Sequence, residues 1–327
     1  MRVGPPPGHP ERQQKDRRRF PRRWNDPVFD LRRRHVYGIP GLILFILSLL
    51  GLWAFVWEPS RLVVRTHTIA MTGWPQGLRP IRAACLGDIH GGSPFIDRAK
   101  LRAIVELTNK QKPDLVALLG DYVVMGVLGG KFMEPEDVAD GLRGLKAPLG
   151  VYVILGNHDW WYNGVRVAQA FKDVGYTVLQ NENAPIVVDG RTLYIVGLED
   201  EWTRRPDVVK VLSRVPAGAP TIVLAHNPDV FARLPSVNGV TFAAHTHGGQ
   251  VRVPFMGAPV VPSRYRQRYV SGHVEEGDQH LFVTSGIGTS LLPVRFRVLP
   301  EIAVVTLTTD PHRSDRAQKH LFDKIQH

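Results

Sequence analysis

The strongest limit on how this chain can fold comes from five short apolar runs that each stop close to an Asp, His or Asn residue. The runs cover residues 81–86, 115–119, 151–155, 221–225 and 240–244. Apolar runs of this length predict buried strands. The carboxyl ends of neighbouring parallel strands meet at one edge of a sheet. We therefore expect the polar residues after these runs to converge on one point, which is the geometry that a metal centre needs.

Polar side chains gather in six segments at or near these strand ends. The segments are Gly87-Asp88-Ile89-His90, Gly120-Asp121, Gly156-Asn157-His158-Asp159, Ala225-His226-Asn227, His245-Thr246-His247 and Gly248-Gly249. Seven of their side chains are candidate metal ligands: Asp88, His90, Asp121, Asn157, His226, His245 and His247. Imidazole with carboxylate suits Mn, Fe or Zn better than Ca or Mg. Seven ligands are too many for one tetrahedral ion and fit two ions that share a bridge.

The spacing inside these segments also favours a shared site. Asp88 and His90 are one residue apart, so on an extended strand both side chains point to the same side. His245 and His247 repeat that arrangement, and the two oxygens of Asp121 can bridge two ions. An Asp-x-His pair alone is common by chance, whereas the whole set in this order is specific.

Such a centre predicts chemistry at phosphorus. Two ions about 3.5–4 Å apart clamp the attacking and leaving oxygens and acidify a bound water. Gly91-Gly92 and Gly248-Gly249 follow the double-ligand segments and permit a close approach of substrate. The sequence therefore predicts a two-metal hydrolase of phosphodiester, pyrophosphate or phosphomonoester bonds. Attack would come from a metal-bridging hydroxide, without a covalent phosphoenzyme.

The positive charge of the chain is concentrated near its start. Of a net charge of +11, residues 1–36 hold 11 Lys and Arg against 4 Asp and Glu, and the other 291 residues hold 30 against 26. A nucleic-acid partner is therefore not expected, because the basic residues belong to a tail rather than to a binding surface. Cys85 is the only cysteine, so no internal disulfide is possible.

An uncharged stretch that follows the basic tail has the length of a transmembrane helix. Residues 36–57 contain no charged side chain, and 22 residues make a helix of about 33 Å, which matches a hydrocarbon core of about 30 Å. Tyr37, Trp53 and Trp57 lie near its ends, where aromatic rings favour the membrane interface. Because the Arg-rich residues precede the span, the positive-inside rule predicts a cytoplasmic N-terminus and an extracytoplasmic catalytic domain at the inner membrane.

Two other interpretations of this stretch are less consistent with its residues. A buried core helix of this length rarely lacks a polar face. Arg17-Arg18-Arg19-Phe20 resembles a twin-arginine signal, but the apolar segment starts well downstream and no small-x-small cleavage site follows Phe55. We therefore expect a retained anchor.

The rest of the chain alternates apolar runs with helical patterns. Residues 97–112, 135–145 and 165–174 are expected helices, residues 187–196 a hairpin around Asp189-Gly190, and residues 302–307 a late strand. This order predicts an α/β body of two packed sheets with helices outside. The expected organisation is a basic disordered tail (1–35), a transmembrane helix (36–57), a linker (58–80), the catalytic domain (81–309) and a polar tail (310–327).

At this point the chain resembles the calcineurin-like metallophosphoesterase superfamily over residues 82–307. The family pattern is Asp-x-His, Gly-Asp, Gly-Asn-His-Asp/Glu, a lone His and Gly-His-x-His, and each part has a counterpart among the segments above. The resemblance implies a four-layer α/β/β/α sandwich. It also implies one ion on Asp88, His90, Asp121 and His247, and a second on Asp121, Asn157, His226 and His245. His158 would be a catalytic residue beside the phosphoryl group rather than a ligand.

The chain departs from the family pattern at two places. Ala244 replaces the usual Gly before His-x-His. Val124 stands where phosphoprotein phosphatases have a second Asp, which argues against a protein Ser/Thr phosphatase. That leaves the partner of His158 unassigned, because Asp159 would point away if its segment were extended.

Residues 245–250 and 285–295 resemble a membrane-anchored bacterial branch of this superfamily. Some of its members are phosphodiesterases, and some cleave the pyrophosphate of a UDP-diacylglucosamine lipid. By its forked geometry Arg295 is a candidate to bind a substrate phosphate. An extracytoplasmic site fits poorly with a UDP-lipid made in the cytoplasm, and favours a lipid-linked or cell-wall phosphoester. The acidic run of residues 199–202 receives no role, since such runs are usually solvated.

Two other functions were kept open. A membrane-tethered sensing module would bind metals without turnover, and a nuclease of the same superfamily would need a basic surface on the catalytic body. No obligate protein partner is inferred.

Overall fold

The computed structural model describes residues 1, 3–4 and 27–310. It divides into two compact units, Met1–Leu50 and Gly51–His327. The predictions of a disordered tail and of a polar tail fall mostly on residues 5–26 and 311–327, which lie outside the described residues.

A long apolar helix precedes the catalytic domain. Helix α1 (Pro27–Leu52) continues as a π-helical turn, η2 (Trp53–Trp57), and a short α2 (Glu58–Ser60). Residues Ile39–Ser60 are long and apolar enough to cross a membrane, with a mean hydropathy of 2.4. The helix begins nine residues before the expected start at residue 36. Pro27 suits a first helical position, because its missing N–H has no partner there in any helix.

The first sheet has six strands in the order β1-β12-β2-β3-β4-β5. Strands β2 (Ile81–Leu86), β3 (Leu115–Leu118), β4 (Val151–Val153) and β5 (Thr177–Val178) are parallel, while β12 (Glu301–Thr309) runs antiparallel to β2. Strand β1 (Val63–Met71) pairs with β12 in parallel. The segment expected as a linker (58–80) therefore contributes an edge strand to the domain.

The second sheet also has six strands, in the order β10-β11-β9-β8-β7-β6. Its centre is parallel and consists of β11 (Gln279–Val283), β9 (Gly239–Ala243), β8 (Thr221–Leu224) and β7 (Arg191–Gly197). Strands β10 (Gly272–Glu276) and β6 (Glu182–Val188) add antiparallel edges. The expected hairpin is β6–β7, and its turn residues Asp189 and Gly190 both have positive φ, as a tight two-residue turn requires.

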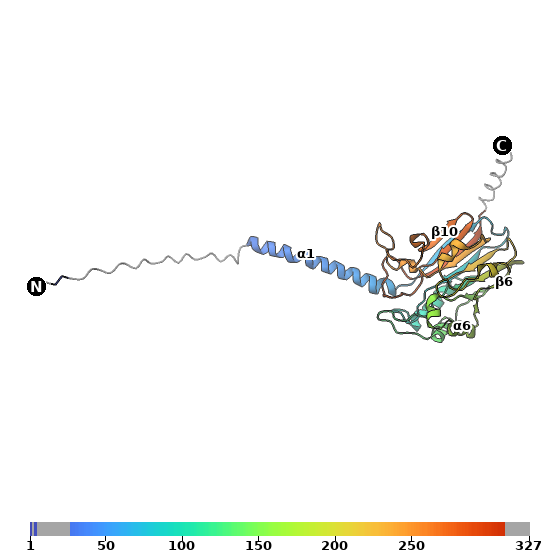
Figure 1. Ribbon diagram of the computed structural model, residues 1–327, viewed down its shortest axis with the longest axis horizontal. Coiled ribbons are helices and arrows are strands. Elements are labelled where there is room, and N and C mark those ends of the chain that lie inside the picture. The colour runs from blue at the N-terminus through green and yellow to red at the C-terminus, as the bar shows by residue number, and fades with distance from the viewer. Residues whose placement is uncertain (2, 5–26, 311–327) are drawn as a thin grey trace, which may run out of the picture. The chain divides into compact units, whose positions relative to one another are not determined.

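The two sheets pack face to face with helices outside, so the predicted four-layer α/β/β/α sandwich is confirmed (Figure 1). Alternate residues of β2 serve different layers: Ala83 and Cys85 face the core between the sheets, while Ala84 and Leu86 face the helices. Helices α3 (Arg98–Lys110), α4 (Pro135–Leu142) and α6 (Gly164–Asp173) cover the first sheet.

Shorter elements complete the domain. Helix α7 (Val208–Leu212) and the 3-10 turns η3 (Pro228–Arg233) and η5 (Arg266–Tyr269) lie against the outer face of the second sheet. Helix α5 (Asn157–Tyr162) and η4 (His247–Gly249) lie directly at strand ends and carry candidate ligands.

Candidate metal centre

The candidate ligands follow the carboxyl ends of β2, β3, β4, β8 and β9, as expected, but their backbone is not extended. Asp88, His90, Asp121, His245 and His247 all have φ between 49° and 70°. The argument from an extended strand is therefore wrong: each pair meets one site through tight left-handed turns. Non-glycine residues in this region cost about 1–3 kcal/mol each and persist mainly at functional sites.

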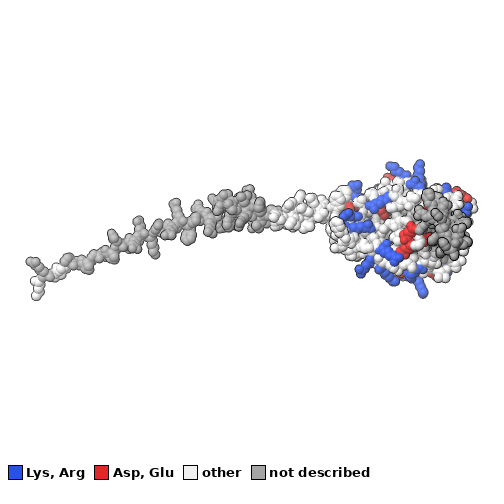
Figure 2. Space-filling view, turned by 90° about the horizontal axis from the view of Figure 1, so that it is seen from above, with Lys and Arg blue, Asp and Glu red and all other residues white. Residues whose placement is uncertain are grey.

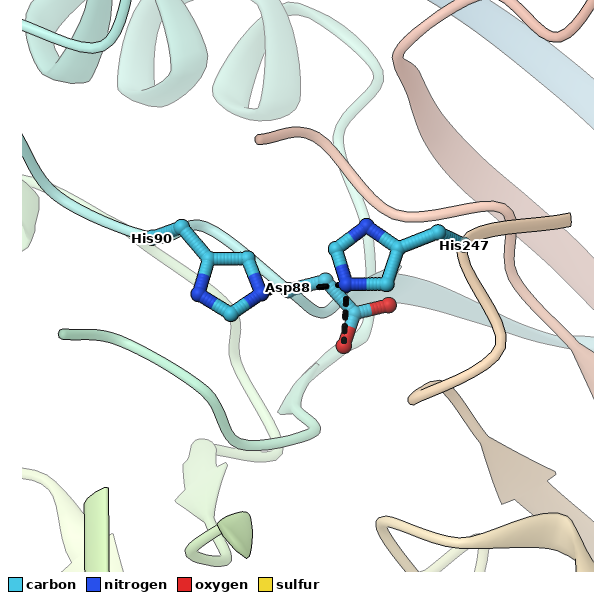
Figure 3. A group of neighbouring side chains, drawn as sticks. All are labelled: Asp88, His90 and His247. Atoms are coloured by element: carbon cyan, nitrogen blue, oxygen red, sulfur yellow. Dashed lines mark hydrogen bonds and ion pairs between the residues drawn. The ribbon is translucent and has the colours of Figure 1, made fainter. Parts of the chain in front are cut away.

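Asp88, His90 and His247 form one group of ligands (Figure 3). The Nε2 atoms of His90 and His247 are 3.0 Å apart, and His247 Nε2 lies 3.9 Å from Asp88 Oδ1. The two rings stack nearly parallel, and all three side chains are buried. Three donor atoms therefore point at one small space.

Asp121, His226 and His245 form a second group, with Asn157 beside it. His226 Nε2 lies 3.3 Å from Asp121 Oδ2, 3.1 Å from Asn157 Oδ1 and 3.2 Å from His245 Nδ1. The Nδ1 of His226 donates to the carbonyl of Leu119 at 2.7 Å. This bond fixes the ring and leaves Nε2 available to bind a metal ion.

Asp121 stands between the two groups. Its Oδ2 atom is 3.3 Å from His226 Nε2 and 3.8 Å from His90 Nε2, so one oxygen faces ligands of both. The glycine at position 156 makes room for this carboxylate, because a Cβ there would fall 2.2 Å from Asp121 Oδ1. One shared oxygen between two ligand groups is the arrangement of a bridged two-ion site.

The donor set calls for positive charge. In neutral His226 the lone pair of Nε2 would face the oxygens of Asp121 and Asn157. This repulsion between lone pairs is relieved only when a cation or a proton lies between them. Burial lowers the pKa of His226, but the carboxylates of Asp121, Asp88 and Asp200 together outweigh burial and raise that pKa to about 10. Asp88 Oδ2 is buried without a hydrogen-bond partner among the described residues. These residues fit divalent metal ions.

The other imidazoles favour the neutral form that binds metals. Burial lowers the pKa of His90 and of His245 to about 3 and that of His247 well below its usual value. Burial also raises the pKa of Asp88 to about 7.

His158 lies at the edge of the centre, where one of its ring nitrogens is within 4.8 Å of ligand atoms of His90 and Asp121. Its side chain is partly buried, and its ring meets the edges of His90 and Trp161 at centroid distances of 4.9 and 4.8 Å. Its Nε2 lies 3.4 Å from Ser290 Oγ, and burial lowers its pKa. Ser290 is thus a further polar neighbour of His158, and no sequence motif indicates this role.

Asp159 does not point away from the site. Its segment is helix α5, which turns the carboxylate back into the domain, where it is fully buried. There it accepts hydrogen bonds from the backbone N–H groups of Asp121, Tyr122 and Gly156 at 2.8–2.9 Å. Asp159 therefore holds the turn that carries Asp121.

Arg295 is not at the surface of the site, where the expected phosphate contact would place it. Its side chain is fully buried, and its guanidinium donates to the carbonyls of Gly288, Ser285 and Val298. These bonds hold the 285–298 segment together. Trp202, in the acidic run given no role, does border the centre, with its ring edge-on to His245 at 4.3 Å.

Fold and site together define a metal-dependent phosphoesterase. The family model for calcineurin-like phosphoesterases matches residues 81–249, and the chain belongs to this family. Among its relatives are an uncharacterized metallophosphoesterase, YkuE, of Bacillus subtilis (32% identical, covering 76% of this chain and 87% of the relative) and the phosphodiesterase YaeI of Escherichia coli (31%, 76% and 90%). A zebrafish transmembrane protein with a metallophosphoesterase domain is 28% identical, and the match spans 62% of its length.

Proposed function

We propose that this protein is a membrane-anchored phosphoester hydrolase that uses two divalent ions. The first ion would bind Asp88, His90, Asp121 and His247, and the second would bind Asp121, Asn157, His226 and His245. The observation that carries the proposal is the place of Asp121 Oδ2, 3.8 Å from His90 Nε2 and 3.3 Å from His226 Nε2. The histidine and carboxylate ligands favour Mn, Fe or Zn.

The ions would polarise the phosphoryl group and lower the pKa of water for in-line attack. The side chains around the ions would position the substrate and transfer a proton to the leaving group. His158, partly exposed and in contact with the His90 ring, would face the phosphoryl group and protonate the leaving oxygen. Trp202 and Trp161, both exposed, would flank the opening to the centre.

The bond cleaved would be a phosphodiester, a pyrophosphate or a phosphomonoester. The Escherichia coli relative is named a phosphodiesterase, which supports the first of these. By the positive-inside rule, the catalytic domain would lie on the extracytoplasmic side of the inner membrane. The substrate would then be an amphiphilic or lipid-linked phosphoester on that side.

A nucleic-acid substrate is less well supported. On the face of the catalytic domain drawn in Figure 2, Lys and Arg are spread among uncharged and acidic residues rather than joined in one band. A continuous basic band is what backbone binding by a nuclease requires.

The test uses the full chain in detergent, stripped with chelator and reloaded with Mn²⁺, Fe²⁺ or Zn²⁺. We expect metal-dependent hydrolysis of bis-p-nitrophenyl phosphate. Stoichiometric metal binding without turnover across mono-, di- and pyrophosphate esters would support the sensing module instead. A reporter fused after Thr309 should be active outside the cytoplasm, and cytoplasmic activity would overturn the topology.

A further inference from the structure

Six large apolar side chains are exposed on three loops of the catalytic domain. Phe255 is fully exposed, and Leu291, Met256 and Leu128 are 78, 68 and 66% exposed. We call the six residues the apolar rim: Met125, Leu128, Phe255, Met256, Leu291 and Leu292. Single exposed apolar residues are ordinary, but a group of them marks an interaction surface.

Hydrogen bonds join the three loops at their bases. The N–H of Leu128 donates to the carbonyl of Leu291 at 3.3 Å. The N–H of Phe296 donates to the carbonyl of Gln250 at 2.9 Å, and Gln250 Oε1 accepts from the N–H of Ser290 at 2.8 Å. The three loops are therefore held to one another rather than independent.

Two rim residues occupy costly backbone conformations. Phe255 has φ 66° and Leu291 has φ 63°, in the left-handed region that glycine or asparagine adopts more readily. Bulky apolar residues at such positions, exposed to water, stabilise neither the turn nor the core. A function outside the folded domain explains why they are there.

The segment that carries Leu291 and Leu292 is bonded, a few residues further on, to the end of the apolar helix. The N–H of Arg295 donates to the carbonyl of Ala54 at 2.9 Å, and the N–H of Arg297 donates to the Glu58 carboxylate at 2.6 and 2.8 Å. Lys100 Nζ donates to the carbonyl of Ser60 at 2.6 Å. Residues 51–60 thus belong to the same compact unit as the rim, and loops near residues 130 and 255 project from the domain beside them (Figure 1).

The same segment carries aromatic and basic side chains that are typical of the membrane interface. The rings of Trp53 and Trp57 lie 4.2 Å apart, and the Arg61 guanidinium lies 4.7 Å above the Trp57 ring. Tryptophan and arginine together are typical of the depth at which lipid headgroups begin. Residues 295 and 297, which follow rim residues Leu291 and Leu292 in the chain, are bonded to this segment, so the rim lies near the expected headgroup layer.

The rim also borders the metal centre. Ser290, next to Leu291, has its Oγ 3.4 Å from His158 Nε2. The N–H of Gly288 donates to the Asp88 carbonyl at 2.6 Å, and a Cβ on Gly286 would fall 2.6 Å from Asp88 Oδ2. A molecule whose apolar part lies on the rim would have its polar part beside the metals.

We propose that the apolar rim enters the headgroup layer of the bilayer that holds the helix. The metal centre then opens at that layer and takes phosphoesters whose apolar part stays in the same leaflet. The insertion stands on the rim alone, whereas the substrate class rests on the proposed phosphoesterase function.

The first test measures depth in the membrane. Cys85 is fully buried, so an introduced cysteine is the accessible thiol. Full-length Phe255→Cys and Leu291→Cys, labelled with NBD in phosphatidylethanolamine/phosphatidylglycerol vesicles, should be quenched by nitroxide lipids about threefold more than Val187→Cys and Val209→Cys. Those control positions are 69 and 80% exposed on β6 and α7. Equal, weak quenching at all four positions would overturn the insertion.

The second test distinguishes the effect of the rim on substrate access from the catalytic activity of the metal centre. In Phe255→Asn/Leu291→Asn, asparagine tolerates the positive φ, so the fold should be retained. The ratio of turnover on a vesicle-embedded phosphodiester to turnover on bis-p-nitrophenyl phosphate should fall about tenfold. An unchanged ratio would contradict the assigned substrate class. Failure of the unsubstituted protein on the soluble ester would instead refute the phosphoesterase proposal and leave the quenching result intact.

Discussion

Asp121 Oδ1 accepts a hydrogen bond from the backbone N–H of His158 at 2.9 Å, while its Oδ2 faces both ligand groups. The carboxylate proposed to bridge the ions therefore also fixes the start of helix α5, on which His158 lies. In this proposal, metal binding and the placement of the proton donor depend on one side chain.

His158→Asn should lower turnover without changing metal content. If His158 protonates the leaving oxygen, its loss costs about 10²–10⁴-fold for a phenyl ester and much less for a p-nitrophenyl ester, whose leaving group needs no proton. Turnover of diphenyl and bis-p-nitrophenyl phosphate measures the difference. Equal losses for both esters would contradict the role, and loss of an ion would make His158 a ligand with His90 and Asp121, which it adjoins.

Asp159→Asn should weaken metal binding although Asp159 is not a proposed ligand. The substitution directs an NH₂ group at backbone N–H donors and loosens the turn that carries Asp121. Loss of such an outer partner typically costs about 10–100-fold in metal affinity. Calorimetric titration with Mn²⁺ measures it, with Asp173→Asn, at the exposed end of α6, as the matched control. Equal affinities in both variants would show that Asp159 does not position Asp121.

Arg295→Lys should reduce stability rather than substrate binding. Lysine cannot replace the bonds to Gly288, Ser285 and Val298, and we expect a loss of about 2–4 kcal/mol in the free energy of unfolding. Unfolding in one detergent and KM for bis-p-nitrophenyl phosphate are measured together. Arg297→Lys, at an exposed neighbouring position, is the control, with a change below about 0.5 kcal/mol. Unaltered stability with a tenfold higher KM would restore the phosphate-binding interpretation.

Metal affinity should rise with pH. Asp88, with its pKa raised to about 7, and His226, with its pKa raised to about 10, hold protons at neutral pH that metal ions must displace. Lower pH keeps those protons bound, so the apparent Kd for Mn²⁺ should fall between pH 6 and 8 with release of about one to two protons. Calorimetry in two buffers of different ionisation enthalpy counts the protons. A flat pH profile without proton release would contradict these protonation states.

The convergence of the candidate ligands could be predicted from the sequence because a physical rule links them. Polar residues at the ends of parallel buried strands share a sheet edge, so position alone predicts that Asp88, Asp121 and His226 lie close together. Helix α3 could also be predicted from the sequence. Asp97, where the predicted helix begins, caps it by accepting a hydrogen bond from the N–H of Lys100.

Other features depend on contacts that no local pattern carries. Arg295 has the same neighbours in sequence whether its guanidinium faces a phosphate or three carbonyls of its own loop. Asp159 would point away only if its segment were extended, and the sequence around it does not reveal that a helix begins at Asn157. The pairing of β1 with β12 joins residues more than 200 positions apart, and so the expected linker turned out to be a strand.

The most direct test of the two-ion centre combines metal analysis with turnover in Asp121→Asn. Elemental analysis of the reloaded full-length protein should find about two ions per chain. The variant should hold at most about one, and its turnover of bis-p-nitrophenyl phosphate should fall by about 10³-fold. A variant that keeps two ions and the turnover of the unsubstituted protein would contradict the shared role of Asp121 and the centre built around it.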